Sequence, residues 1–197
     1  MCKEIDWKRE PLSKSLLDFA DENIKLDAAK RVVHSINDKY AAIASRQLST
    51  ASLKSSDELK DMTEGEQILR KIIEPYKGKI VLLDIWGTWC GPCKEALSHS
   101  QEEYERLKDY PMVYLYLANR SNDTSWKNVI KEYNVTGDNV AHYNLPASQQ
   151  SAIENFLSVH SFPSYRLFDQ QGNLLDVNAD PRDLDALEGL IKKISAQ

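Results

Sequence analysis

The sequence lacks the features that mark several large classes of protein. None of its apolar runs approaches the roughly 20 residues that a membrane-spanning helix needs. It has no basic stripe or arginine cluster, and its formal net charge is −5, so we expect no nucleic-acid partner. Met1 is not followed by the apolar stretch of a signal peptide. Taken as the full native chain, the sequence therefore predicts a cytoplasmic protein.

Cys2 indicates a different location if the sequence is part of a longer one. A cysteine directly behind the initiator methionine is what remains when a bacterial lipoprotein is expressed from its lipid-attachment site onward. On this interpretation the protein lies in the bacterial periplasm or cell envelope, and Cys2 carries a lipid anchor. The alternative is an incidental exposed cysteine, and the sequence does not decide between the two.

Cysteine is scarce, with three residues in 197, and two of the three lie together in Cys90-Gly91-Pro92-Cys93. A C-x-x-C motif is also half of a zinc site, which needs two more ligands, usually a second C-x-x-C or a pair of histidines. Only Cys2 and four scattered histidines are available. The motif opens a predicted helix, and the amino end of a helix can lower the pKa of the first thiol. The pattern favours a redox dithiol over a zinc site or two incidental buried cysteines.

Residues 1–75 predict helices. Apolar residues recur at helical spacing over 24–48, with charged residues between them. A further helix is predicted at 63–74, where Thr63 and Glu66 fit a capping box. We expect this part of the chain to be a helical extension or a small module. Its apolar stripe either packs on the rest of the chain or forms a dimer or partner surface.

Strands and helices alternate after residue 76. A run at 80–86 that is apolar on both faces except for Asp84, and a fully apolar run at 112–118, predict two central strands. A short turn that contains glycine joins 164–168 to 174–177, which predicts a hairpin. The helices predicted around these strands lie at 91–107, 125–133, 147–157 and from residue 180 onward. This order predicts an α/β fold, with a mixed sheet and helices on both of its faces.

Asp84 lies in the middle of the first apolar strand, six residues before Cys90. Burial at this position disfavours the ionised carboxyl group, so we expect a raised pKa. Such a group could accept the proton of Cys93 when that thiol attacks a mixed disulfide. The alternative is an aspartate that is hydrated or caps a neighbour at the strand end. The apolar neighbours Leu83 and Ile85 favour the proton role.

Other residues near the motif suit the binding of a substrate. Trp89 borders the thiols as an apolar docking surface, and Pro92 fits the first turn of a helix, where its missing N–H is harmless. Phe162-Pro163 is a candidate cis peptide bond, because a proline opens a strand about seventy residues beyond a C-x-x-C motif.

The run from Val81 to Lys94 resembles the active-site strand and helix of thioredoxins almost residue by residue. The resemblance implies that the family's buried acid falls on Asp84 and its cis-proline on Pro163. It also implies an attacking thiol at Cys90 and a resolving thiol at Cys93.

The extra helical segment at about 119–158 is similar to the insertion of the TlpA/ResA group, which are thioredoxin-like proteins of the bacterial envelope. We therefore expect a thioredoxin-like mixed β-sheet flanked by helices over residues 76–197. Residues 1–75, which the resemblance does not cover, form the expected N-terminal helical extension.

The resemblance implies a thiol-disulfide oxidoreductase that reduces protein disulfides in the bacterial envelope. Its redox group is the Cys90–Cys93 disulfide, so no cofactor and no metal is expected. The expected partners are protein or peptide disulfide substrates and an electron donor or acceptor of the membrane or envelope. Substrate contacts are expected from five residues, namely Trp89, Gly91, Pro92, Phe162 and Pro163.

Two departures from the family pattern leave the redox potential open. Ser98 stands where thioredoxins carry a proline that kinks the active-site helix. Ala96 stands where many TlpA/ResA proteins have a glutamate, and Glu95 lies on a different face of the helix. The Gly-Pro dipeptide between the cysteines resembles reducing thioredoxins rather than strong oxidants.

Two other functions compete with this one. A peroxiredoxin would need the pattern P-x-x-x-(S/T)-x-x-C, which Leu83 and Thr88 do not fit. A non-enzymatic alternative is an envelope binding or chaperone module that uses the N-terminal helices, with redox activity secondary.

Overall fold

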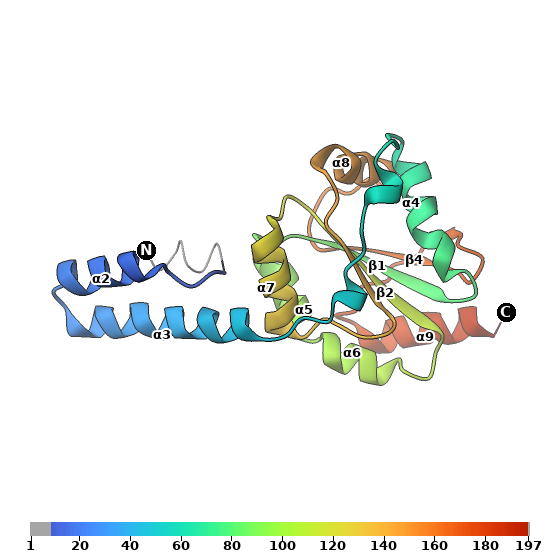
Figure 1. The fold of residues 1–197 in the computed structure, drawn as a ribbon. Helices are drawn as coiled ribbons and strands as arrows, with labels where there is room; N and C mark the ends of the chain where they lie inside the picture. Colours follow the sequence, from blue (N-terminus) through green and yellow to red (C-terminus); the bar gives the residue numbers. More distant parts are fainter. Residues whose placement is uncertain (1–8, 197) are drawn as a thin grey trace. The chain divides into compact units, whose positions relative to one another are not determined.

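The computed structural model describes residues 9–196, which divide into two compact units (Figure 1). The helical unit comprises the residues up to 48 together with 122–134. The sheet unit comprises 49–121 and the residues from 135 onward. The sequence instead divides the chain near residue 75, because it cannot reveal which helix packs on the sheet. Cys2 lies outside the described residues.

The described part of the helical unit contains the helices α2 (Lys14–Asn23), α3 (Asp27–Ser45) and α7 (Asp123–Tyr133). Tyr40 and Ile43 of α3 form its small apolar cluster. The buried Arg9 pairs with Glu132 of α7, and Asn128 donates a hydrogen bond of 2.8 Å to the Arg9 carbonyl. These polar contacts join segments that lie more than one hundred residues apart in the sequence.

The sheet unit is built on five strands, which are β1 (Ile80–Trp86), β2 (Met112–Ala118), β3 (Val140–Tyr143), β4 (Ser164–Phe168) and β5 (Leu174–Leu175). Their order is β3-β2-β1-β4-β5. β1 and β3 both pair with β2 in parallel, whereas β4 pairs with β1 and β5 in antiparallel fashion. The expectation of a mixed sheet is therefore confirmed, and β1 lies at its centre.

β3 lies within the segment 119–158, for which the sequence predicted a helical insertion with an irregular stretch around His142 and no strand. Its four residues are too few for a clear alternating pattern, and they include a histidine. Pairing with β2 places His142 opposite Tyr116, and the two rings stack 4.7 Å apart. The His142 ring also forms a 2.7 Å hydrogen bond with the Val135 carbonyl. Tertiary contacts of this kind, which the local sequence does not encode, form the strand.

Helices cover both faces of the sheet (Figure 1). One face carries α4 (Gly65–Ile73) and α8 (Ala147–Phe156), and the other carries α6 (Ser100–Arg106) and α9 (Leu184–Ser195). Successive side chains of a strand point to opposite faces, so Val81, Leu83 and Ile85 of β1 face α4 and α8. Leu82 and Asp84 face the other side.

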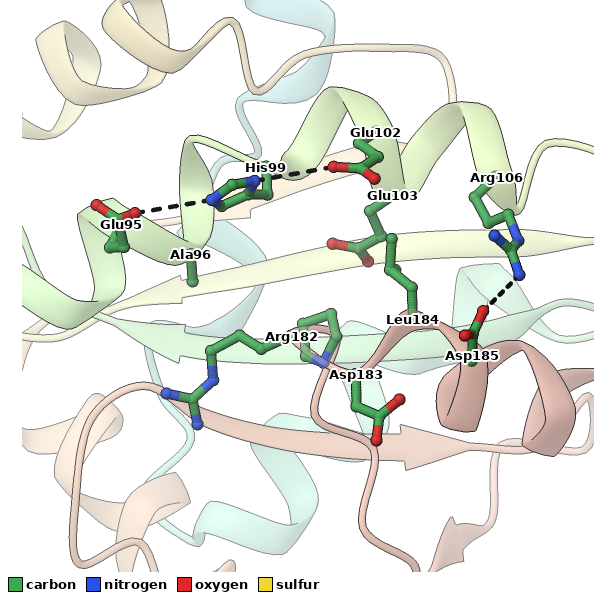
Figure 2. Close-up of a pocket in the computed structure, with 11 residues that line it drawn as sticks. Glu95, Ala96, His99, Glu102, Glu103, Arg106, Arg182, Asp183, Leu184 and Asp185 are labelled. Carbon is green, nitrogen blue, oxygen red and sulfur yellow. Dashed lines mark hydrogen bonds and ion pairs between the residues drawn. The ribbon is translucent and has the colours of Figure 1, made fainter.

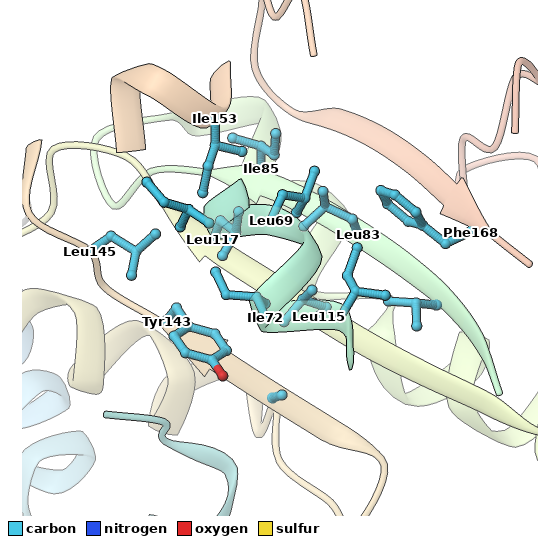
Figure 3. Close-up of a cluster of buried hydrophobic side chains, with 14 of the residues drawn as sticks. Leu69, Ile72, Leu83, Ile85, Leu115, Leu117, Tyr143, Leu145, Ile153 and Phe168 are labelled. Atoms are coloured by element: carbon cyan, nitrogen blue, oxygen red, sulfur yellow. The ribbon is translucent and has the colours of Figure 1, made fainter. Parts of the chain in front are cut away.

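The α4/α8 face holds the main apolar cluster of the sheet unit (Figure 3). Full burial of one large aliphatic side chain stabilises a fold by roughly 1.5–3 kcal/mol, so this cluster fixes the position of β1. Its members, which come from both helices and from the strands, include Leu69, Ile72, Leu83, Ile85, Leu115, Leu117, Leu145, Ile153 and Phe168.

The start of α4 differs from the prediction. The predicted capping box is absent, because the N-cap residue is Glu64 and it makes no side-chain capping hydrogen bond. The helix starts at Gly65, where a Cβ atom would lie 2.0 Å from the Ala152 carbonyl oxygen of α8. Close approach of the two helices, rather than Thr63, therefore determines how α4 begins.

The helix predicted at 91–107 is divided into α5 (Gly91–Leu97) and α6. The break occurs at Ser98, although no proline is present there. The Ser98 hydroxyl donates a 2.6 Å hydrogen bond to the Glu95 carbonyl, and the His99 amide bonds to the Ala96 carbonyl three residues earlier. Back-bonding of this kind bends helices. Ser98 thus lies at a break in the helix, at the position where thioredoxins carry the proline that kinks their active-site helix.

Candidate active site

The two cysteines form a disulfide where β1 leads into α5. Cys90 is the N-cap residue of α5, and its Sγ atom accepts a 3.1 Å hydrogen bond from the Cys93 amide. Cys90 is 4% exposed and Cys93 is fully buried. In the reduced protein the helix amino end favours a thiolate at Cys90. Cys90 therefore keeps a small exposed surface, whereas Cys93 has none.

An aromatic contact brings the start of β4 next to the disulfide. The rings of Trp89 and Phe162 meet edge to face, with their centroids 5.2 Å apart. The Phe162–Pro163 peptide bond is cis. Trp89 is 36% exposed, and Gly91 and Pro92 are exposed as well. The five residues predicted to contact substrate thus lie around the disulfide with accessible surface, and their role in binding stays a prediction.

A hydrogen-bonded network that the sequence did not indicate supports the turn before Cys90. The Trp89 indole donates to the Asn119 carbonyl at 3.1 Å, and the Thr88 amide donates to the Ser121 hydroxyl at 3.0 Å. The Asn119 side-chain amide donates to Glu154 at 2.7 Å. The position of Asn119, directly after an apolar strand, is the one signal that could have pointed to this network.

Asp84 is buried on the α6/α9 face of β1. It is 6% exposed, and its Oδ1 atom has no hydrogen-bond partner among the described residues. Burial raises the pKa of Asp84 to about 8, the negative charge of Asp180 raises it further, and Arg182 opposes the shift. The sheet register places Tyr116 and Tyr165 on either side of it. Asp84 therefore holds a proton at neutral pH, while its role in proton transfer stays a prediction.

Glu103 is a second buried acid on the same face, which the sequence analysis missed. It is 7% exposed, and its Oε1 atom has no partner within the part of the chain that is described. Burial raises the pKa of Glu103 to about 8, and the charge of Asp84 contributes in the same direction. Its position could have been predicted, since Leu97, Ser100, Glu103 and Leu107 follow the spacing of one helix face.

Tyrosine hydroxyl groups complete this polar layer. The hydroxyls of Tyr104 and Tyr116 lie 2.8 Å apart, and the rings of Tyr104 and Tyr114 are 4.3 Å apart. Burial raises the pKa of Tyr104 and of Tyr116 well above the usual range. These phenols therefore stay neutral near neutral pH.

A groove of about 720 Å³ opens between α5–α6 and the segment that leads into α9 (Figure 2). Glu103 lies on its inner side, while Arg182 lines the opposite wall. Arg106 bridges the two walls through a 2.7 Å ion pair with Asp185. Within residues 9–196, no group of three or more His, Cys, Asp or Glu side chains is placed to hold a metal ion.

Known proteins resemble this chain in sequence and in fold. Residues 78–174 match the model of the Thioredoxin-like family. The chain is 27% identical to the thiol-disulfide oxidoreductase ResA of Bacillus cereus over an alignment of 132 residues. This alignment covers 67% of this chain and 71% of the relative. It is 26% identical over 136 residues to a thioredoxin of Malassezia sympodialis, covering 68% and 90% of the two chains.

A solved structure of similar fold is the thioredoxin domain of a thiol-disulfide oxidoreductase from Bacteroides vulgatus. It superposes with a TM-score of 0.51 at 20% identity, over 62% of this chain and 84% of the other. This likeness concerns the fold alone.

Residues 78–174 thus match a thioredoxin-like domain, and the predicted thioredoxin-like fold is confirmed. Its relatives include thiol-disulfide oxidoreductases named ResA, and the chain carries the Cys90–Cys93 pair at disulfide distance. No helix of the described residues is long and apolar enough to cross a membrane.

Proposed function

We propose that this protein reduces disulfide bonds of protein or peptide substrates by thiol–disulfide exchange. The observation that carries the proposal is the Cys90–Cys93 disulfide at the start of α5, in which Cys90 keeps a small exposed surface and Cys93 has none. The Cys90 thiolate attacks a substrate disulfide, and one substrate sulfur leaves as a thiolate. Cys93 then attacks the sulfur of Cys90, which releases the second substrate thiolate and forms the internal disulfide. The disulfide itself is the redox group, so no cofactor takes part.

Asp84 is the proposed acceptor of the Cys93 proton. Cys93 must lose its proton before it attacks, and it is fully buried away from water. Only the ionised carboxyl can take that proton, so the second step should accelerate as the pH approaches the Asp84 pKa of about 8. The first step depends on the Cys90 thiolate and should follow a different pH dependence.

The two steps can be separated with a chromogenic aromatic disulfide in a stopped-flow instrument. The reduced protein should release one aromatic thiolate when Cys90 attacks and a second when Cys93 resolves the mixed disulfide. Asp84→Asn should slow the second phase more than the first, whereas Asp109→Asn, an exposed control, should change neither. Equal slowing of both phases would remove Asp84 from the proton transfer.

The substrate chain is proposed to lie beside Pro163, where the protein backbone would line it as an added extended strand. The accessible surface of Trp89 and the contact of its ring with Phe162, directly before Pro163, support this placement. Cys93→Ala should hold native substrates as mixed disulfides on Cys90, which mass spectrometry after diagonal electrophoresis identifies. The Cys90→Ser/Cys93→Ala variant is the matched control, and capture by that variant would count against exchange at Cys90.

The bacterial envelope is the proposed location, with an envelope electron donor that reduces the internal disulfide. The resemblance to the TlpA/ResA group and the relatives named ResA support this part of the proposal. A lipid anchor at Cys2, which lies outside the described residues, would hold the protein at a membrane. Fractionation of native cells and metabolic labelling with a fatty acid test both ideas, because Cys2→Ser should abolish labelling.

A second function rests on the helical unit. Large apolar side chains stay exposed on and between α2 and α3, namely Leu16, Phe19, Leu26 and Val32. Such surface suits a binding or chaperone role in which redox activity is secondary. Cys90→Ser separates the two functions, since partner binding and phenotype that survive this change would favour the second.

A further inference from the structure

Asp84 has to release each proton that it accepts before it can act again. It is buried, and its Oδ1 atom has no hydrogen-bond partner among the described residues. The groups that surround it therefore decide when it is ionised and how its proton reaches water.

Titratable and charged groups reach this part of the protein from every element packed on the α6/α9 face. They are Tyr114 and Tyr116 of β2, Tyr165 of β4, Glu103 and Tyr104 of α6, and Asp180 and Arg182 before α9. The groove beside Glu103 is lined in addition by Glu95, His99, Glu102, Arg106, Asp183 and Asp185.

Most of these groups keep one protonation state near neutral pH. Burial raises the pKa of each of the four tyrosines, so the phenols stay neutral. Hydrogen bonds from Arg182 lower the pKa of Asp180, so that carboxylate stays ionised and Arg182 stays protonated. Glu103 is the remaining buried carboxyl group, and burial raises its pKa into the same range as that of Asp84.

Glu103 also has the right position. It points from α6 toward the sheet, and its Oε1 atom is buried without a partner in the described part of the chain. The same side chain lines the groove opposite Arg182 (Figure 2). Asp84 and Glu103 both act electrostatically on Tyr104 and Tyr116, whose hydroxyls lie 2.8 Å apart. One carboxyl group thus lies between the buried Asp84 region and a solvent-filled opening.

We propose that Glu103 is a positioning residue that acts through Asp84. The two carboxyl groups form a coupled pair, and the groove beside Glu103 is where the pair exchanges protons with water. The proposal rests on the function proposed above for Cys90 and Cys93, because the pair serves the step in which Cys93 loses its proton.

The coupling determines when a base is available. In the resolving step the S–H bond of Cys93 breaks and its proton moves to the Asp84 carboxylate. The Cys93 sulfur bonds to Cys90, and the substrate sulfur leaves with the electron pair. A carboxyl pair that holds two protons contains no base. When the pair has lost one proton, the remaining proton is on Glu103 in a fraction of the molecules, and in these Asp84 is an ionised base. Loss of the second proton is opposed by the negative charge that the pair already carries.

Carboxyl ¹³C NMR titration of the oxidised protein tests the pair directly. In the wild type, the Asp84 carbon should titrate in two steps over a wider pH range than one group requires. In Glu103→Gln it should titrate in one step that is complete at lower pH. Glu102→Gln is the matched control, since Glu102 is the adjacent exposed acid of the same groove, and it should follow the wild type. A single-step wild-type curve, or the same curve in Glu103→Gln, overturns the proposal.

The reciprocal measurement covers the case in which Glu103→Gln does not fold. Coupling between two sites is mutual, so Asp84→Asn should turn the Glu103 titration into a single step at lower pH. An unchanged Glu103 curve in Asp84→Asn overturns the proposal equally.

A kinetic readout separates coupling from a merely structural role. In the stopped-flow assay, Glu103→Gln should reach the full rate of the second phase at lower pH, with a gain of about twofold at intermediate pH. The first phase should stay unchanged. A uniform change at every pH would mean that Glu103 only supports the fold, which overturns the proposal. The NMR experiment needs no substrate, so intact coupling without thiolate release would refute the oxidoreductase function and leave the carboxyl pair standing.

Discussion

Replacing Asp84 by asparagine should change how the stability of this protein depends on pH. In the unfolded chain the carboxyl group ionises at its ordinary pKa of 3.8, whereas burial raises the pKa to about 8 in the folded protein. Between these values the folded state holds a proton that the unfolded state has lost. The free energy of unfolding therefore falls as the pH rises through this window, and above the folded pKa it stops falling.

The magnitude follows from the width of the window. The two pKa values differ by about four pH units, and each unit corresponds to roughly 1.4 kcal/mol. Ionisation of Asp84 thus costs the folded protein on the order of 5 kcal/mol once the pH exceeds about 8. A loss of that size is comparable to the whole stability of many domains, which is about 5–15 kcal/mol. Asparagine has nearly the same shape and carries no such penalty.

Urea denaturation of the oxidised protein at a series of pH values measures the effect. The wild type and Asp84→Asn should be closest in stability near pH 4. The variant should then gain up to about 1.4 kcal/mol per pH unit until about pH 8, where the difference becomes constant. Asp109→Asn should run parallel to the wild type throughout. Parallel curves for wild type and Asp84→Asn would mean that Asp84 ionises normally in the folded state, and the reasoning about its proton would be refuted.

Three further predictions follow from the geometry. In the reduced protein, iodoacetamide should modify Cys90 before Cys93, because only Cys90 has exposed surface; peptide mapping that finds the reverse order would contradict this. Gly65→Ala should destabilise the protein by about 1–3 kcal/mol in thermal unfolding, since the new Cβ atom would clash with the Ala152 carbonyl. Gly189→Ala is the control, because a Cβ atom there has no neighbour within 4 Å, and it should be neutral or slightly stabilising. Glu154→Ala should lower the free energy of unfolding by about 1–3 kcal/mol, because the side-chain amides of Asn119 and Gln150 lose their shared acceptor. An unchanged melting temperature would show that the hydrogen-bonded network under Trp89 does not stabilise the protein.

The sequence predicted those parts of the fold that local patterns encode. β2 is a fully apolar run and β1 is interrupted only by Asp84, and their observed bounds, Ile80–Trp86 and Met112–Ala118, equal the predicted ones. Asp84 could be predicted as a buried acid because it interrupts such a run. The Cys90–Cys93 pair could be predicted because these are the two cysteines that lie close together in the sequence. They follow a predicted strand and open a predicted helix, which is the setting of a redox dithiol.

The parts that the sequence did not predict depend on contacts between distant segments. β3 forms because β2 offers it a paired edge, and α4 starts at Gly65 because α8 approaches closely there. Glu103 was missed for a different reason. A glutamate in a charged stretch of helix is ordinarily exposed, so its residue type argues against burial, although it shares the spacing of one helix face with Leu97, Ser100 and Leu107.

The two faces of β1 separate stability from chemistry. Val81, Leu83 and Ile85 lie in the apolar cluster, whereas Asp84 on the opposite face lies among phenols and Glu103. A buried carboxyl oxygen without a hydrogen-bond partner lowers the free energy of unfolding by about 1–3 kcal/mol. The face of β1 that carries Asp84 therefore contributes less to stability than the apolar face. A slip of β1 by one residue would exchange the faces and move Asp84 into the apolar cluster. Parallel pairing with β2 and antiparallel pairing with β4 oppose that slip, so the apolar face and its two neighbouring strands are what keep Asp84 on the face of Glu103.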